Sequence, residues 1–299
     1  MSVTVRVPAK VNVQLAVGAA RPDGFHDLAN VFLAVGLYDE VTVTAADGLR
    51  VTCAGPDADQ VPLDRTNLAA RAALVLAGRY GRDADVHIHI VKDIPVAGGM
   101  AGGSADGAGA LLACDALWGT GASRDELLDI CAELGSDVPF SLVGGAALGT
   151  GRGEKLTELE VGGSFHWVFA MASRGLSTPA VFREFDRLGE GREIPGPVAS
   201  QELLDALAEG DVDALAAAVS GSNDLQPAAL SLFPELADTL AAGRAAGALA
   251  TLVSGSGPTT AFLARDAEAA DVIAGALRAS GTCRTVRRAA GPAPGATVV

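Results

Sequence analysis

The sequence predicts an α+β or mixed α/β protein of two domains. Segments with strand-like alternation and segments with helical periodicity follow one another along the chain. The length of 299 residues is enough for a hydrophobic core in each of about two domains. Hydrophobic residues make up 49% of the sequence and charged residues 19%, which argues against wholesale disorder. The boundary is expected within residues 155–165, after the glycine-studded segment GGAALGTGRGEKL, so that the domains cover residues 1–158 and 159–299.

The first strand is expected between Val3 and Leu15, because apolar residues occupy its odd positions and polar residues alternate with them. Period two places Lys10 and Asn12 on one face of that strand. Pro8 interrupts the alternation, and this predicts an edge position or a bend. The further expected strands cover residues 39–44, 86–91, 146–148, 167–172, 250–253 and 260–263.

Helical periodicity predicts seven helices, and no internal repeat is visible among them. They are expected at residues 67–80, 104–118, 124–134, 201–207, 212–219, 236–246 and 267–279. The last stretch of the chain, AAGPAPGATVV, is rich in Pro, Gly and Ala. Such a composition predicts a frayed tail without a function.

The segment PVAGGMAGGSADGA, residues 95–108, carries four glycines within six positions and leads through Ser104 into an apolar helical stretch. Glycine allows the backbone to approach a ligand closely, so that consecutive N–H groups can converge on an anion. The start of the following helix adds its positive end. A flexible linker or a tight turn between strand and helix is the alternative. Met100 and Ala101 in the middle of the segment favour phosphate binding, because linkers rarely carry such residues there.

Charge and cysteine usage limit the classes of partner. The formal net charge of −14 argues against broad nucleic-acid binding, since a phosphate backbone is held by clustered Lys and Arg. An anionic small molecule requires a local positive site built from a lysine, backbone amides and a metal ion. The four cysteines show no paired spacing, and no signal peptide or membrane span is visible, so a cytoplasmic location is expected. The cysteines are Cys53, Cys114, Cys131 and Cys283.

Asp137 and Lys10 are the candidates for chemistry. Asp137 lies in ELGSDVPF, at a joint after the helix that should end at Gly135. Its carboxylate either caps the backbone of a short Pro-containing turn or accepts a proton from a substrate hydroxyl. A strand lysine such as Lys10 is usually solvated, but a phosphate loop, a lysine and a carboxylate together are what phosphoryl transfer needs. His87 and His89 share a strand face, and without a third ligand nearby they indicate a solvent-facing edge rather than a metal site.

Four separated blocks of the sequence are PAKVNVQLAVGAARPDGFHDL (8–28), PVAGGMAGGSADGA (95–108), LGSDVPFSLVGGAALGTGRGEKL (134–156) and VSGSGPTTAFL (253–263). These blocks resemble the GHMP kinases, a family of small-molecule kinases, and follow one another in family order. A segment of the type AK(I/V)N…R.DG(Y/F)H.L is distinctive of the branch that acts on 4-diphosphocytidyl-2-C-methyl-D-erythritol, and it stands here at residues 9–28. NDLQP, residues 223–227, is a weaker fifth block.

The resemblance implies a two-domain GHMP kinase fold, with the active-site cleft between the domains and a ferredoxin-like C-terminal domain. It implies ATP-dependent phosphorylation of the 2-hydroxyl of 4-diphosphocytidyl-2-C-methyl-D-erythritol with Mg²⁺, by a catalytic pair of Lys10 and Asp137. Ser254 to Gly257 would form a turn close to the nucleotide loop, or simply a hairpin turn. The implied ATP-binding residues are Pro95, Val96, Ala97, Gly98, Gly99, Met100, Ala101, Gly102, Gly103, Ser104 and Ala105.

For the substrate, the resemblance implies that Asn12 places the methylerythritol hydroxyls and that His26 hydrogen-bonds the cytosine. Phe25 would stack on one face of the base, and Phe182 would close the other face or pack in the core. A GHMP kinase for mevalonate, homoserine or a sugar is the alternative, and it predicts no role for Phe25 and His26. A non-catalytic nucleotide-binding protein is a second alternative. Neither the oligomeric state nor the metal ligands follow from the sequence.

The glycine segment departs from the usual family pattern at four positions. Met100 replaces a leucine of similar size. Ala101 stands where relatives have glycine, so it needs a negative φ or adds strain of about 1 kcal/mol or more. Ala105 removes a hydroxyl, and Ser104 remains as a contact for metal or phosphate. The four positions are Ala97, Met100, Ala101 and Ala105.

Overall fold

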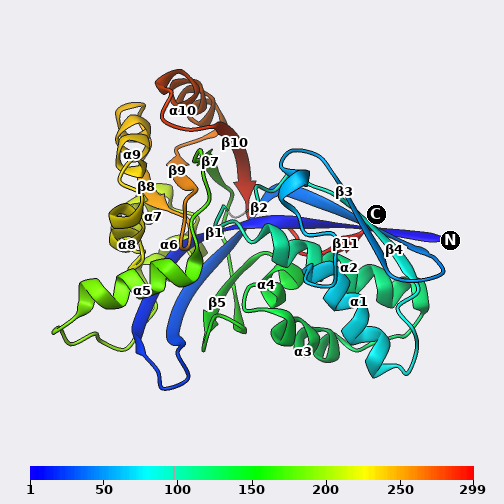
Figure 1. Cartoon of the computed structure of the whole chain (residues 1–299). Coiled ribbons are helices and arrows are strands. Elements are labelled where there is room, and N and C mark those ends of the chain that lie inside the picture. Colours follow the sequence, from blue (N-terminus) through cyan, green and yellow to red (C-terminus); the bar gives the residue numbers. More distant parts are fainter. Residues whose placement is uncertain (97) are drawn as a thin grey trace.

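The computed structural model describes residues 1–96 and 98–299, and two β-sheets with their helices make up the fold (Figure 1). The larger sheet has seven strands in the order β11-β1-β2-β4-β3, and β5 and β6 extend it from β2. Among the described residues, only β3 and β4 pair in parallel within this sheet. Its strands are β1 (Ser2–Ala20), β2 (His26–Ala45), β3 (Arg50–Ala54), β4 (Val86–Val91), β5 (Ala146–Thr150), β6 (Lys155–Leu159) and β11 (Thr297–Val298).

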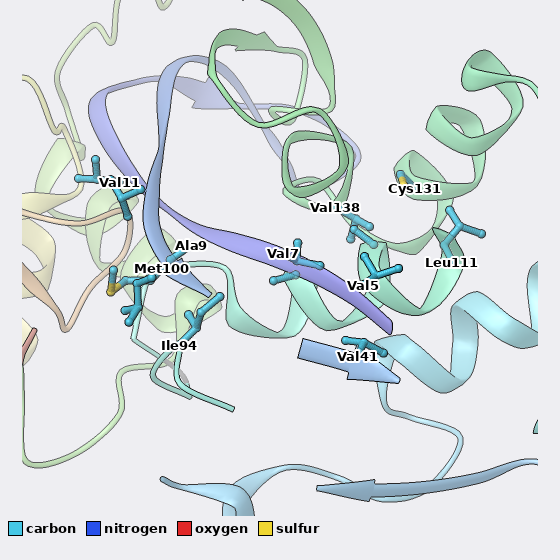
Figure 2. Close-up of a cluster of buried hydrophobic side chains, with 14 of the residues drawn as sticks. Val5, Val7, Ala9, Val11, Val41, Ile94, Met100, Leu111, Cys131 and Val138 are labelled. Atoms are coloured by element: carbon cyan, nitrogen blue, oxygen red, sulfur yellow. The ribbon is translucent and has the colours of Figure 1, made fainter. Parts of the chain in front are cut away.

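Helices cover one face of the larger sheet because their apolar sides match the apolar positions of β1 and β2. Figure 2 shows Val5 and Val7 of β1 and Val41 of β2 in the same buried cluster as Leu111, and each of these side chains is fully buried. The central helix of the layer therefore packs directly on the first hairpin. The layer consists of α1 (Leu68–Arg79), α2 (Gly102–Trp118), α3 (Arg124–Leu134) and α4 (Val138–Val143), with a short 3₁₀ turn at Ala58–Gln60.

The smaller sheet has four antiparallel strands in the order β10-β7-β9-β8. Counted along the chain this order is 4-1-3-2, the ferredoxin-like arrangement, so the predicted fold class is confirmed. Figure 1 shows α9 and α10 on the side of this sheet that faces away from α1 and α2. The elements are β7 (Phe165–Met171), α5 (Thr178–Gly189), α6 (Gln201–Glu209), α7 (Val212–Val219), α8 (Gln226–Leu232), α9 (Leu236–Ala245), β8 (Ala250–Val253), β9 (Thr260–Ala264), α10 (Ala267–Ser280) and β10 (Thr285–Gly291).

The predicted elements agree best where an amphipathic period is regular. The strands at 86–91 and 250–253 and the helices at 124–134 and 212–219 have the predicted bounds. The second strand was predicted too short, because residues 29–35 are buried without alternation and therefore carry no period-two signal. Pro8 marks a bend, since the register of β1 against β2 shifts between Pro8 and Ala9. The elements that were not predicted are β3, β6, β10, β11, α4, α5 and α8.

The expectation of a frayed C-terminal tail is wrong. Thr297 and Val298 pair with β1. Ala293 is buried, its carbonyl oxygen accepts from the N–H of Gly145, and its own N–H donates to the carbonyl oxygen of Ala34. Pro and Gly here permit close backbone packing rather than disorder. The chain therefore returns from β10 of the smaller sheet to the larger one before it ends.

The region expected to hold the domain boundary contains a strand. Residues 155–159 form β6, which pairs with β5 of the larger sheet, and residues 160–164 link it to β7 of the smaller sheet. We keep a division into residues 1–158 and 159–299 as a proposal.

The expected edge position of His87 and His89 is wrong, because β4 lies between β2 and β3, where both rings contact the Thr52 hydroxyl. Within the described ranges, no helix has the length and apolar character that crossing a membrane requires.

Candidate active site

Lys10 and Asp137 lie next to each other, with 3.6 Å between Lys10 Nζ and Asp137 Oδ2. The lysine is not a solvated strand residue, since it is 4% exposed. Its ammonium group donates to Asn12 Oδ1 at 2.5 Å and to the carbonyl oxygen of Gly99 at 2.9 Å. Burial lowers the pKa of Lys10 from its ordinary value, and the negative charge of Asp137 offsets part of this effect.

The carboxylate of Asp137 does not act as a helix cap. Asp137 occupies the N-cap position of α4 after α3 ends at Leu134, yet its side chain accepts no capping hydrogen bond from the described residues. The N-cap of α3 behaves differently, because the Ser123 hydroxyl accepts from the N–H of Glu126. The Asp137 carboxylate is one-third exposed and lines the main cavity beside Lys10. Of the two alternatives left open by the sequence, the geometry favours a chemical role.

The glycine segment packs against the Ser254–Gly257 turn of the smaller sheet. Gly99 has φ +74°, and a Cβ there would stand 2.3 Å from the carbonyl oxygen of Ser254, so no other residue fits without movement. The Ser254 hydroxyl donates to the Gly99 carbonyl at 3.1 Å, and the Thr259 N–H donates to the Gly98 carbonyl at 3.3 Å. The turn is thus close to the loop, as the resemblance implied.

Ala101 adopts the left-handed conformation that the sequence identified as the strained alternative. Its φ and ψ are 61° and 31°, at the N-cap of α2. A non-glycine residue in this region adds about 1–2 kcal/mol of strain. Met100 is buried in the same cluster as Ala9 and Ile94 (Figure 2), and its carbonyl oxygen accepts from the N–H of Lys10. The loop is therefore anchored on one side by Met100 and strained on the other at Ala101.

A cavity of about 550 Å³ connects the glycine segment with the first hairpin. The first turn of α2 forms one wall, and the first N–H groups of a helix lack partners within it. Met100 and Ala105 are buried in the core, and Pro95 and Val96 line a separate cavity of about 220 Å³ that meets Gly98 from the other side. Ala97 lies outside the described residues. The predicted ATP-binding residues that line the main cavity are Gly98, Gly99, Ala101, Gly102, Gly103 and Ser104.

A buried charge cluster of Lys92, Asp39 and Asp106 lies next to the glycine segment at Gly102. Lys92 Nζ lies 2.5 Å from Asp39 Oδ2 and 3.0 Å from Asp106 Oδ2, and all three residues are buried. Asp39 also accepts from the backbone N–H groups of Asp93 and Ile94. Burial raises the pKa of Asp106 to about 8, with the neighbouring charge of Asp39 acting in the same direction and that of Lys92 against it.

At the other end of the cavity the structure brings together Phe25, His26 and Phe182. The rings of His26 and Phe182 are stacked with centroids 5.0 Å apart, while Phe25 is 48% exposed. His26 Nδ1 is bonded to the carbonyl oxygen of Gly18 at 2.9 Å, which leaves Nε2 for a ligand. Nε2 lies 3.6 Å from the carboxylate of Asp186.

Asn12 connects the catalytic pair to the second strand. Its Oδ1 accepts from Lys10, and its Nδ2 donates to Asn30 Oδ1 at 2.8 Å. Asn30 was not singled out in the sequence, because a lone asparagine in an apolar strand gives no signal. Lys92 and its partners Asp39 and Asp106 were also not singled out, because the three residues are far apart along the chain.

Three further cavity residues were missed, although two of them lie within the four blocks. Arg152 stands in the third block, Thr178 precedes Phe182, and Ser256 belongs to the fourth block. The Thr178 and Ser256 hydroxyls lie 2.8 Å apart. Gly255 has φ +58°, and a Cβ there would be 3.0 Å from Asn12 Oδ1 and 3.4 Å from Lys10 Nζ. The turn at 254–257 is therefore part of the site rather than only a hairpin connection.

The donor set for a metal ion is sparse in the protein itself. In the ranges 1–96 and 98–299, no cluster of three or more His, Cys, Asp and Glu side chains is arranged to hold a metal. Mg²⁺ bound through nucleotide phosphates needs only one or two protein ligands. Ser104 and Asp137 both line the main cavity and carry oxygen atoms of the kind that Mg²⁺ prefers.

Comparison with known proteins identifies the relatives of the chain. Residues 67–145 match the family described as GHMP kinases N terminal domain, and residues 203–283 match GHMP kinases C terminal. The chain is 84% identical to the 4-diphosphocytidyl-2-C-methyl-D-erythritol kinase of Streptomyces coelicolor over 100% of both chains. It resembles a crystal structure of 4-(cytidine 5'-diphospho)-2C-methyl-D-erythritol kinase with a TM-score of 0.75 at 33% identity, covering 96% of this chain and 98% of that one. A homoserine kinase from Cytophaga hutchinsonii, 21% identical over 100% of this chain and 97% of its own, shares the fold with a TM-score of 0.75.

Proposed function

Because the chain belongs to the 4-diphosphocytidyl-2-C-methyl-D-erythritol kinases of the GHMP kinase family, we propose that its cavity performs the reaction of that family. The enzyme transfers the γ-phosphoryl group of ATP to the 2-hydroxyl of 4-diphosphocytidyl-2-C-methyl-D-erythritol and releases ADP. The observation that carries the assignment to these residues is the arrangement of the cavity. A lysine–carboxylate pair lies beside the glycine segment at one end, and an aromatic group with His26 lies at the other.

The catalytic step centres on Asp137. Its carboxylate orients or deprotonates the 2-hydroxyl, whose oxygen forms the new bond to the γ-phosphorus while the bond to the ADP oxygen breaks. Lys10 stabilises the Asp137 carboxylate and the charge that develops on the transferred group. Asn12, which accepts from Lys10 and donates to Asn30, positions the methylerythritol hydroxyls beside this pair.

The glycine segment binds the triphosphate. Backbone amides at Gly98 to Ser104 and the first turn of α2 supply donors and a partial positive charge at the cavity wall. Pro95, Val96, Met100 and Ala105 contribute by shaping the loop backbone, since their side chains lie outside the main cavity. Mg²⁺, held by the phosphates with Ser104 and Asp137 as the available protein ligands, would neutralise charge on the transferred group.

The cytosine binds at the aromatic end. Nδ1 of His26 is committed to the Gly18 carbonyl, so Nε2 is the nitrogen that faces the base. Phe25 and Phe182 provide apolar ring surface for stacking. The large exposed fraction of Phe25 is consistent with a ring that becomes covered only when the substrate binds.

All four cysteines are free thiols, which supports a location in the reducing cytoplasm.

A substrate panel tests this function. ADP release is measured with 4-diphosphocytidyl-2-C-methyl-D-erythritol, mevalonate, homoserine and galactose at matched concentrations. Activity with the cytidine-bearing alcohol alone is expected. Preference for a cytidine-free alcohol would contradict the proposed substrate and indicate that of another GHMP kinase. The absence of ADP release with every acceptor would indicate a non-catalytic nucleotide-binding protein.

A further inference from the structure

The hairpin between β5 and β6 contributes Arg152 to the wall of the cavity. His26, Leu28 and Asn30 alternate along β2 on the cavity side, with roughly 7 Å between successive members. His26 belongs to the aromatic end, and Asn30 bonds to Asn12 beside the catalytic pair. The N–H of Leu28, halfway between them, donates to the carbonyl oxygen of Gly151 at 2.8 Å. The residue that follows, Arg152, is therefore placed between the two ends.

Arg152 offers a positive charge without a carboxylate partner. Its guanidinium lies 5.1 Å from the centroid of the Phe25 ring, and no carboxylate oxygen of the described residues lies within 4.0 Å of it. The Lys10 ammonium, by contrast, is already paired with Asp137 and two further oxygens. In a chain of net charge −14, this guanidinium is a local positive site on the cavity wall.

The turn that carries Arg152 is held in place by its own hydrogen bonds. The carboxylate of Glu154 accepts from the backbone N–H of Arg152 at 2.7 Å. The N–H of Gly153 donates to the carbonyl oxygen of Thr150 at 3.0 Å. The base of the side chain is thus fixed before a ligand arrives, so that less conformational entropy is lost on binding.

We propose that Arg152 binds the diphosphate that links the cytidine to the methylerythritol, and thereby selects a cytidine diphosphate ester over a free nucleoside. This inference rests on the proposed function, because the ligand's base and alcohol must occupy the two ends of the cavity. A diphosphate then falls at its middle, where Arg152 stands. A guanidinium can donate two parallel N–H bonds to phosphate oxygens, which an ammonium cannot match.

The test compares R152Q with the wild-type enzyme and with K155Q. Lys155 is an exposed cation three positions further along the same hairpin and does not line the cavity, so its variant controls for net charge. Cytidine and CDP are titrated by calorimetry in the presence of a saturating non-hydrolysable ATP analogue, which keeps CDP out of the glycine segment. The measured quantity is the ratio of the two dissociation constants, supplemented by KM and kcat for the full substrate.

In wild type and K155Q, CDP should bind more tightly than cytidine. R152Q should reduce this preference by about 10- to 100-fold without changing cytidine binding, since hydrogen bonds to charged groups contribute on that scale. KM should rise while kcat stays close to wild type, because the diphosphate is remote from the reacting atoms. Equal weakening of cytidine and CDP would show that Arg152 only packs on Phe25, and an unchanged ratio would remove its role altogether. Failure of the proposed function looks different, since the wild type itself would then neither turn over the substrate nor prefer CDP.

Discussion

The Lys10 ammonium lies 3.6 Å from the Asp137 carboxylate and also donates to the Gly99 carbonyl at 2.9 Å. One buried cation therefore joins the first strand, the glycine segment and the joint between α3 and α4. Any change that moves one of these three elements alters the surroundings of the other two.

Replacement of Asp137 by Asn should lower kcat by roughly 10²- to 10⁴-fold, the usual effect of removing a general base. The side chain makes no capping bond with the described part of the chain, so any change in the free energy of unfolding should come from the lost ion pair with Lys10 and not from the helix end. D211A is the matched control, since Asp211 does cap its helix, accepting from the N–H groups of Asp213 and Ala214. It should lose about 1 kcal/mol of stability and keep its turnover. Near-normal turnover of D137N would refute the catalytic role.

Replacement of Gly255 by Ala should reduce kcat by roughly 10- to 100-fold, because the new methyl group would press on Asn12 and Lys10 and misplace them. Gly281 provides the control. Its φ of +68° is as unfavourable for alanine, but apart from Gly281 itself and its two chain neighbours no heavy atom in the described ranges lies within 4 Å of a Cβ there. G281A should lose stability alone, whereas G255A should lose both stability and activity in steady-state assays. Equal activity of the two variants would contradict this reading of the turn.

Replacement of Ala101 by Gly should raise the free energy of unfolding by about 1 kcal/mol, because it removes the left-handed strain at φ +61°. The greater freedom of glycine in the unfolded chain offsets part of the gain. Chemical denaturation measures the difference. A101G less stable than wild type would mean that the methyl group makes compensating contacts.

The stability of the buried charge cluster should depend on pH through Asp106. In the folded protein the Asp106 carboxyl has a pKa of about 8, whereas in the unfolded chain its pKa is near the ordinary value of 3.8. The folded state therefore binds more protons between these limits, and the stability contributed by Asp106 falls as pH rises from about 4 to about 8. Asn cannot titrate, so the stability of D106N relative to wild type should increase over this range.

Denaturation of wild type and D106N at pH 5, 6, 7, 8 and 9 checks this expectation. Lys92 and Asp39 face the same carboxyl and remain in both proteins, so the pH dependence of the difference reports the loss of Asp106 together with its effect on these two neighbours. A difference in unfolding free energy that does not vary with pH would show that Asp106 is ionised throughout.

Predictions from local pattern succeeded where one face of an element is polar. The helix at 124–134 and the strand at 86–91 have a clear period, and both were placed with correct bounds. The middle of β2 failed because it is buried on both faces, and the tail at 289–299 failed because Pro and Gly serve close packing as well as disorder. Of the proposed site residues, those that fall within a short motif could be named from the sequence. Asn30 lies in the same cavity outside the four blocks, and Arg152 lies within the third block without having been singled out, so their place in the cavity became visible only with the fold.

The sequence by itself determined the family, the fold class, the glycine segment and the shared face of Lys10 and Asn12, because these follow from local spacing and from motifs in a fixed order. Only the tertiary structure decided that Asp137 faces Lys10 instead of capping its helix, that Ala101 is strained, and that the chain ends against its own first strand. Each of these depends on contacts between segments distant along the chain. No local pattern records such contacts, since the free energy that selects them comes from the packing of the whole molecule.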